Sequence, residues 1–161
     1  MIGNRGYAMY IREWVRAEQG DWESAYDSPR HAPAGWKYLG QGCFRAAYLS
    51  PDNVVYKVQH YAGTGQSNFT EYRKYNRLRL EHKLPEGARF PLLQHFALAN
   101  GDGVNAMDHV GPTLNKYTGD DYHKHSSCLA DISRQLRLWD MHHGNAAVDV
   151  ERGLIVPIDL G

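Results

Sequence analysis

Apolar side chains recur along this chain with two different spacings, one typical of helices and one typical of strands. Three segments have the helical spacing of three to four positions: residues 7–19, residues 68–81, and a segment that begins at Ser126 or Ser127 and ends at Leu138. Gly20 is expected to end the first helix, and Trp139 falls on the apolar side of the third. The pattern therefore predicts three amphipathic helices.

Short runs rich in valine, leucine and aromatic residues predict strands, and turn residues separate these runs. The runs are residues 36–39, 46–49, 54–58, 90–98, 104–110, 146–150 and 154–158. Asn100-Gly101-Asp102-Gly103 is a strong hairpin signal between two of them. Short connections of this kind join antiparallel neighbours. We therefore expect the α+β class, with an antiparallel sheet, a helix packed on it, and a hairpin near the C-terminus.

Composition limits the classes of function. With 161 residues and 42% hydrophobic side chains, the chain is long enough for a folded domain with its own core. A formal net charge of +0 does not favour nucleic acid or an anionic membrane surface as a partner. Cys43 and Cys128 lack metal-ligand spacing, which fits a reducing cytosol and leaves a single disulfide open. We see neither a signal peptide nor an apolar run that could span a membrane, and expect a cytoplasmic protein.

The C-terminal segment combines side chains that phosphoryl transfer to an alcohol requires. Asp140 and Asn145 lie five positions apart in a polar stretch, and the last strand leads to Asp159. One carboxylate can accept the hydroxyl proton, while an amide and a second carboxylate can hold Mg²⁺ on the nucleotide phosphates. An ordinary hairpin with polar loops remains the alternative interpretation.

A glycine-rich turn lies one hairpin before a lysine-bearing strand. Gly40 and Gly42 stand at the tip of the first strand pair, where missing side chains let the backbone approach phosphates closely. Lys57 lies in an otherwise apolar strand, and a desolvated ammonium is costly unless it meets an anion. Two alternatives stay open here: a simple tight turn at the glycines, and an edge-strand Lys57 that faces water.

These motifs follow one another in the order found in protein kinases. Leu-Gly-x-Gly-x-Phe followed by Val-x-Lys-Val resembles the glycine-rich loop and the ATP-anchoring lysine strand. The variant Gly-x-Gly-x-Phe-x-Ala-Ala-Tyr, with a later Asp-Met-His-x-Gly-Asn and a terminal Ile-x-Asp, is more similar to the early serine/threonine kinases of short-tailed bacteriophages. The resemblance covers residues 36–161 and implies a protein-kinase-like fold. Residues 36–110 would form its N-terminal lobe, residues 111–161 a much reduced C-terminal lobe, and residues 1–35 a helical extension.

The resemblance also implies a role for each motif residue. The cofactor-binding set comprises Gly40 and Gly42 over the triphosphate, Lys57 on its phosphates, Glu71 as the partner of Lys57, and Asp108 and His109 in the adenine-binding hinge. The catalytic set comprises Lys57, Asp140 at the acceptor hydroxyl and His142 beside the transferring phosphate, while Asn145 and Asp159 would bind Mg²⁺. Two structural alternatives stay open: Glu71 completing a capping box with Asn68, and a purely structural His142.

The expected activity is ATP- and Mg-dependent phosphoryl transfer to serine or threonine of host proteins. By analogy with phage kinases, the targets would belong to the host transcription or RNA-processing apparatus, in the host cytoplasm. The sequence stops at Gly161 without an activation segment, which implies a minimal or C-terminally truncated kinase and leaves a homodimer open.

Other functions remain open beside this one. A weak or inactive kinase-fold module could capture a host protein without transferring phosphate. A small-molecule kinase is favoured by His142 but would normally use a larger C-terminal lobe. The residue types of His123, His125 and Cys128 suit zinc, although their spacing matches no zinc motif.

Overall fold

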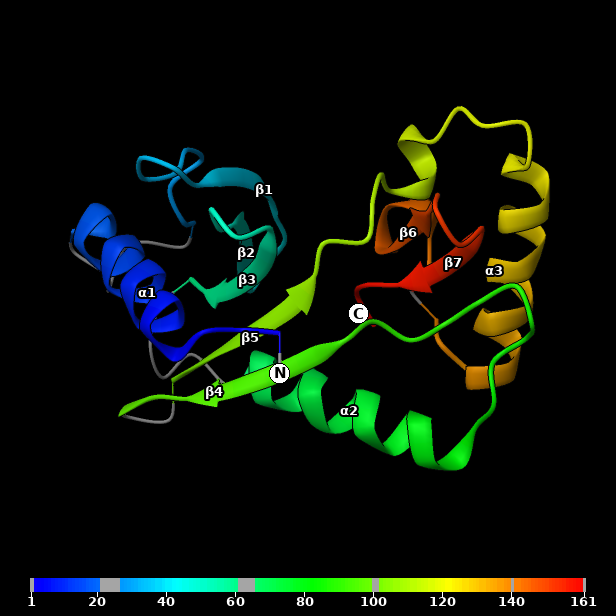
Figure 1. The fold of residues 1–161 in the computed structure, drawn as a ribbon. Helices are drawn as coiled ribbons and strands as arrows, with labels where there is room; N and C mark the ends of the chain where they lie inside the picture. Colours follow the sequence, from blue (N-terminus) through cyan, green and yellow to red (C-terminus); the bar gives the residue numbers. More distant parts are fainter. Residues whose placement is uncertain (1, 21–26, 61–65, 100–101, 140, 161) are drawn as a thin grey trace. The chain divides into compact units, whose positions relative to one another are not determined.

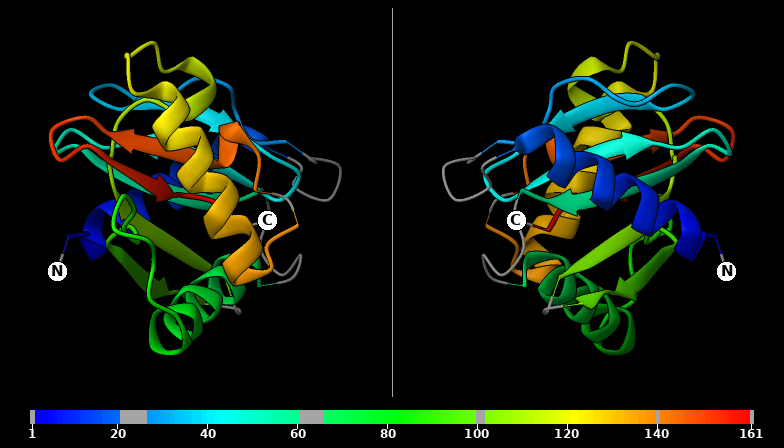
Figure 2. Two further views of the ribbon diagram at one scale, coloured as in Figure 1. Left: turned by 90° about the vertical axis from the view of Figure 1, so that its right-hand side faces the viewer. Right: turned by 90° about the vertical axis from the view of Figure 1, so that its left-hand side faces the viewer.

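The computed structural model describes residues 2–20, 27–60, 66–99, 102–139 and 141–160. The chain divides into two compact units, the first formed by Met1–Tyr72 with Leu92–His109 and the second by Arg73–Pro91 with Val110–Gly161. Helix α2 (Ser67–Glu81) begins in the first unit and ends in the second. Figure 1 follows the elements along the chain by colour, and Figure 2 gives two further views of them.

A five-stranded antiparallel sheet is the framework of the first unit. Its strands follow the order β1 (Lys37–Gln41), β2 (Arg45–Leu49), β3 (Val54–Gln59), β5 (Gly103–Asp108) and β4 (Leu93–Ala97). β4 and β5 pair with Phe96 opposite Val104, which confirms the predicted hairpin; residues 100 and 101 of its turn lie outside the described ranges. The sheet places β3 in its interior, between β2 and β5 (Figure 1).

The two faces of this sheet differ in chemistry because side chains alternate along each strand. One face is apolar and completely buried at its centre, where Tyr48 pairs with Tyr56 and Val58 with Val104. The opposite face carries polar side chains on three neighbouring strands. In register on this face lie Arg45 opposite Gln59, and Lys57 between Ala47 and Asn105.

Helix α1 (Arg5–Gln19) covers the apolar face of the sheet. Asn4 caps its first turn by accepting a hydrogen bond from the Tyr7 N–H, and Gly20 ends it with a φ of 66° that favours glycine. Ala8, Ile11 and Val15 are fully buried against the strands. The first unit therefore includes α1 in its core, whereas the motif spacing sets residues 1–35 apart as an extension.

Two half-buried arginines attach α1 to the β4–β5 hairpin. Arg12 Nε lies 2.8 Å from Asp102 Oδ2, and Arg16 Nη2 lies 3.1 Å from the same oxygen. The Asp102 side chain is fully buried, so both cations compensate a carboxylate that has lost its hydration. Nothing in the residue spacing predicts this contact, which joins segments 90 positions apart in the sequence.

The second unit combines a helix with a two-stranded hairpin. Its elements after α2 are the 3₁₀-helix η2 (Leu114–Lys116), helix α3 (Tyr122–Leu136), the 3₁₀-helix η3 (His143–Asn145), β6 (Ala146–Asp149) and β7 (Leu154–Pro157). β6 pairs antiparallel with β7, and α3 packs against β7. The predicted C-terminal hairpin is confirmed. The unit also takes in the C-terminal part of α2, since the Tyr75 hydroxyl donates to the Pro157 carbonyl at 2.7 Å.

Helix α3 differs from its prediction at both ends. It begins at Tyr122 rather than at Ser126 or Ser127, so the histidines at 123 and 125 lie on a helix. It ends at Leu136, and Arg137 follows in the left-handed conformation with a φ of 54°. This reversal turns Leu138 inward, at 5% exposure, and leaves Trp139 99% exposed. Trp139 is therefore not a core residue. Within the described residues, none of the helices is long and apolar enough to cross a membrane.

Replacing Ile11 by alanine tests the contribution of α1 to the core. Ile11 is fully buried, so Ile11→Ala should lower the free energy of unfolding by about 2–5 kcal/mol. Met9→Ala on the same helix is the matched control, because Met9 is 48% exposed and its loss should cost less than about 1 kcal/mol. Urea unfolding followed by circular dichroism measures both. Equal effects of the two substitutions would contradict the packing of α1 on the sheet.

Candidate functional site

Lys57 forms a buried ion pair on the polar face of the sheet. It lies on the interior strand β3 and is 8% exposed, which rules out the edge-strand lysine that faces water. Its Nζ is 3.0 Å from Oε2 and 3.2 Å from Oε1 of Glu71. A buried ammonium requires such a partner, because its lost hydration would otherwise cost several kcal/mol. The structure thus brings together the two residues that the sequence motifs couple.

Glu71 is shared between two cations. It is 5% exposed on the first turns of α2, and Arg45 of β2 also lies against it, with Nη1 2.7 Å from Oε1. Asn105 of β5 donates a further hydrogen bond to Oε1 at 3.2 Å. Burial alone would raise the pKa of Glu71, but the charges of Lys57 and Arg45 outweigh it and lower the pKa to about 2. The carboxylate is therefore ionised throughout the neutral range.

Asn68 fixes α2 to the sheet and does not form a capping box with Glu71. The helix begins at Ser67, one residue before Asn68, and the Asn68 N–H donates to the Gln59 side chain at 3.2 Å. Its side-chain amide donates to the backbone carbonyls of Lys57 at 2.8 Å and Gly103 at 2.9 Å. The capping-box interpretation is wrong, because the carboxylate of Glu71 faces the sheet. Asn68 instead sets the position from which Glu71 reaches Lys57.

The glycine-rich turn joins β1 to β2 next to this cluster. Gly40 adopts a φ of 147°, a conformation that favours glycine, beside an irregularity in the β1–β2 register. The Gly42 N–H donates to the Arg45 carbonyl at 2.9 Å and closes the turn. Among the described residues, a Cβ placed on Gly40 or on Gly42 would meet no atom within 4 Å. Packing inside the protein therefore does not require these glycines, and a ligand can approach the backbone.

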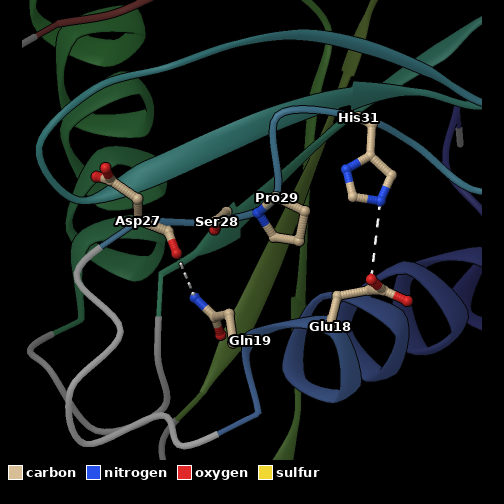
Figure 3. Close-up of a pocket in the computed structure, with 6 residues that line it drawn as sticks. All are labelled: Glu18, Gln19, Asp27, Ser28, Pro29 and His31. Carbon is tan, nitrogen blue, oxygen red and sulfur yellow. Dashed lines mark hydrogen bonds and ion pairs between the residues drawn. The ribbon is translucent and has the colours of Figure 1, made fainter.

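The segment before β1 supports the far side of this turn. The Gly42 carbonyl lies 2.7 Å from His60 Nε2, and His60 Nδ1 lies 2.9 Å from the Ser28 hydroxyl. Ser28 also lines a small polar pocket together with Glu18, Gln19, Asp27, Pro29 and His31 (Figure 3). Within it, the Gln19 amide donates to the Asp27 carbonyl at 3.1 Å. None of the predicted site residues lines this pocket, so we assign it a structural role.

Asp108 and His109, predicted to lie in an adenine-binding hinge, make structural contacts at the end of β5. The Asp108 carboxylate accepts the Leu92 N–H at 2.8 Å, and its own N–H donates to the Leu92 carbonyl at 3.2 Å. The exposed His109 places Nδ1 3.2 Å from the Asn53 side chain. These contacts hold the end of the strand in place. Adenine recognition by this segment stays a prediction.

In the second unit, Asn145 and Asp159 lie side by side. Asn145 closes η3, and its carbonyl accepts the N–H groups of Ile158 at 2.9 Å and Asp159 at 3.2 Å. This arrangement follows from the pairing of β6 with β7, because the hairpin brings the residues after β7 back to Asn145, which precedes β6. An amide oxygen and a carboxylate are the oxygen ligands that Mg²⁺ prefers. The pair therefore has the donor set of the predicted metal site.

The remaining predicted catalytic residues are described only in part. Asp140 lies outside the described residues. His142 is exposed, and its Nδ1 accepts the Gly144 N–H at 3.0 Å, a structural contact that caps η3. The neighbouring His143 is held between two hydroxyls of α3, with Nδ1 2.8 Å from Tyr122 and Nε2 3.2 Å from Ser126. These contacts fix the start of η3 to α3.

The histidines of α3 form no metal site in the described part of the chain, where no group of three or more His, Cys, Asp and Glu side chains gathers. His125 is fully buried, and its Nε2 lies 2.9 Å from the Asp121 carboxylate. Its ring also packs edge-on against Tyr117. We assign it to the packing of α3.

Sequence reasoning missed Arg45, Asn68 and Asn105 as members of the Glu71 cluster. Arg45 lies between the motif residues Gly42 and Lys57, and the resemblance gives it no role. The signal was nevertheless present in the strands. Positions 45, 57 and 105 fall on one sheet face once the antiparallel register is assigned.

The chain matches no protein-family model and no curated protein. Among solved structures it is similar to one described as a co-crystal structure of WbdD and the kinase inhibitor LY294002, with 18% sequence identity and a TM-score of 0.47. The alignment covers 83% of this chain but 33% of that one, so this chain spans about a third of its length.

The carboxylate of Glu71 should make the stability of the protein depend on pH. Because the pKa of Glu71 falls to about 2 in the folded state, its contribution is complete above its ordinary pKa of about 4.5 and is lost as the pH falls toward 2. Glu71→Gln should lower the free energy of unfolding at neutral pH by on the order of 3 kcal/mol. Urea unfolding at pH values between about 7 and 3 measures the difference from wild type.

The difference between wild type and Glu71→Gln should shrink steadily below about pH 4.5, because Glu71 is then protonated in the unfolded state while it stays ionised in the folded state. Glu151→Gln is the control, because Glu151 is exposed in the β6–β7 turn and should change stability little. A difference that is independent of pH would contradict the ionised, doubly paired Glu71.

Proposed function

We propose that this protein is a kinase that transfers the γ-phosphoryl group of ATP to serine or threonine hydroxyls of another protein. The observation that carries the proposal is the buried Lys57–Glu71 pair on the polar sheet face, next to the glycine-rich turn. Buried ion pairs add little net stability, and apolar residues of similar volume in their place often give equal or greater stability. A lysine kept at this cost on an interior strand favours a function for its charge.

The first unit contributes the groups that would bind the nucleotide. Gly40 and Gly42 carry no side chains that would block a phosphate from the backbone of the turn, which the Gly42 N–H closes by donating to Arg45. Lys57 would neutralise negative charge on the α- and β-phosphates, and Glu71 would hold the ammonium in position. Because Glu71 stays ionised, this positioning would persist across the neutral pH range.

The second unit contributes the groups for the metal and the acceptor. Asn145 and Asp159 would hold Mg²⁺, which supplies positive charge to the β- and γ-phosphates when bound. Asp140 would orient the acceptor hydroxyl and take its proton late in the transfer. His142 would lie beside the transferring group in addition to its structural contact with Gly144. Such catalysis depends on positioning and electrostatics, so the removal of any one of these charges should lower the rate of transfer strongly.

The choice of a protein acceptor is supported by the sequence resemblance. The order of the glycine turn, the lysine strand and the Asp-Met-His-x-Gly-Asn segment is similar to that of early phage serine/threonine kinases. We extend this analogy to the biological role and propose host proteins as targets, with the transcription or RNA-processing apparatus first among them.

A labelling experiment tests the proposed activity. Purified protein with Mg²⁺ and γ-labelled ATP, with and without host cell lysate, should place label on serine or threonine of itself or of a lysate protein. Asp140→Asn and Asp159→Asn should each reduce this labelling by about 100-fold or more, because each removes a charge from the reacting centre. Phosphoamino-acid analysis of the labelled bands identifies the acceptor residue.

Asp131→Asn is the matched control, since Asp131 is an exposed carboxylate of α3 whose described partner is Arg134. This variant should label as wild type does. Absence of labelling by the wild-type protein in the presence of lysate would contradict a kinase. Undiminished labelling by Asp159→Asn would contradict the proposed metal site.

A further inference from the structure

We propose that Arg45 is a positioning residue that holds Glu71 in place while Lys57 engages the nucleotide. This inference rests on the proposed function, because it concerns the same phosphate-binding site. It assigns a role to a residue to which the kinase resemblance gives none. Three features of the structure support this role: a shared carboxylate, a common sheet face, and a backbone link to the glycine-rich turn.

The first observation is that Arg45 and Lys57 approach the same carboxylate from neighbouring strands. Arg45 Nη1 lies 2.7 Å from Oε1 of Glu71, and Arg45 Nη2 lies 2.8 Å from Oε2. Lys57 Nζ lies 3.0 Å from Oε2. The guanidinium therefore contacts both oxygens in the paired geometry that makes arginine–carboxylate bonds strong and directional.

The second observation is that the surrounding side chains fix Arg45 in this position. Its neighbour on the adjacent strand is Gln59, and the next residue of β2 on the same face is the small Ala47, which lies opposite Lys57. Arg45 Nη1 also donates to the Asn68 side-chain oxygen at 3.2 Å. Its side chain is 13% exposed, so this contact is not a surface ion pair of the weak, solvent-screened kind.

The pairing of Glu71 with two cations affects nucleotide binding. When the ammonium of Lys57 turns toward phosphate oxygens, its bond to Glu71 must lengthen or weaken. A buried carboxylate that loses its only cation is strongly destabilised. Arg45 removes this penalty, because it keeps Glu71 paired while Lys57 moves. Glu71 then remains available to orient Lys57 from behind.

The third observation is that Arg45 connects this carboxylate to the glycine-rich turn. Its carbonyl accepts the N–H of Gly42, so its backbone closes the turn while its side chain binds Glu71 of α2. One residue thus ties the position of the turn to the position of the helix. A glycine at position 45 would keep the carbonyl that accepts the Gly42 N–H but would lack the side chain that binds Glu71.

The test compares MgATP affinity across a set of variants that keep the rest of the site intact. Arg45→Gln should raise the Kd for MgATP by about tenfold, the size of one charge-assisted hydrogen bond. Arg45→Lys keeps the charge but cannot contact Glu71 and Asn68 together, so its Kd should lie between wild type and Arg45→Gln. Isothermal titration calorimetry measures Kd, and thermal unfolding shows which variants are folded.

Two further variants separate positioning from simple loss of stability. Arg12→Gln removes another buried arginine–carboxylate contact in the same unit, at Asp102, and should leave the Kd for MgATP unchanged. If Arg45 acts through Glu71, adding Arg45→Gln to Glu71→Gln should change Kd by less than about twofold. If Arg45→Gln does not fold, the same comparison is made with Arg45→Lys.

The possible results separate the role of Arg45 from the proposed kinase function. Wild-type affinity in folded Arg45→Gln, or an undiminished effect in the Glu71→Gln background, would overturn the role of Arg45 alone. Failure of the wild-type protein to bind MgATP would overturn the proposed function, and this inference with it. A tenfold loss in Arg45→Gln that disappears without Glu71, and that Arg12→Gln does not reproduce, supports the inference.

Discussion

The burial of Lys57 is the constraint on which the first unit depends. An ammonium on an interior strand has lost most of its hydration, so a carboxylate must meet it there. Glu71 does so from α2, which fixes where that helix begins and how it lies on the polar sheet face. Arg45 and Asn105 also contact the Glu71 carboxylate and replace the rest of its lost hydration. The burial of α1 against the apolar face stabilises the unit, which leaves the polar face available for function.

In the second unit, backbone hydrogen bonds bring two of the predicted site residues together. Its hairpin reverses the chain so that the segment after β7 meets the segment before β6. The Asn145 carbonyl then binds two successive N–H groups, and the side chains of Asn145 and Asp159 are placed by adjacent backbone. These backbone bonds hold the two residues close together. The histidine at 143, held by two hydroxyls of α3, anchors the same segment from the other end.

The sequence predicts local features well and long-range contacts poorly, for identifiable reasons. Strand runs and hairpins follow from alternation and turn residues, and they are found where expected. Helix α3 starts at Tyr122, earlier than predicted, and the Ser126 hydroxyl contacts His143 from within the helix. Trp139 is exposed because Arg137 reverses the chain before it. The Lys57–Glu71 pair was expected from motif order. The part played by Arg45 required the strand register, which the spacing of residues alone does not supply.

The most direct test of the account is whether Lys57 meets the phosphates of a nucleotide. An acyl-phosphate derivative of ATP transfers its acyl group to a lysine that lies beside the bound phosphates, and peptide mass spectrometry locates the modified residue. The account predicts that Lys57 is modified in the folded protein and that excess MgATP protects it. Modification confined to exposed lysines such as Lys37 and Lys83, with no protection by MgATP, would contradict a nucleotide site at the buried ion pair.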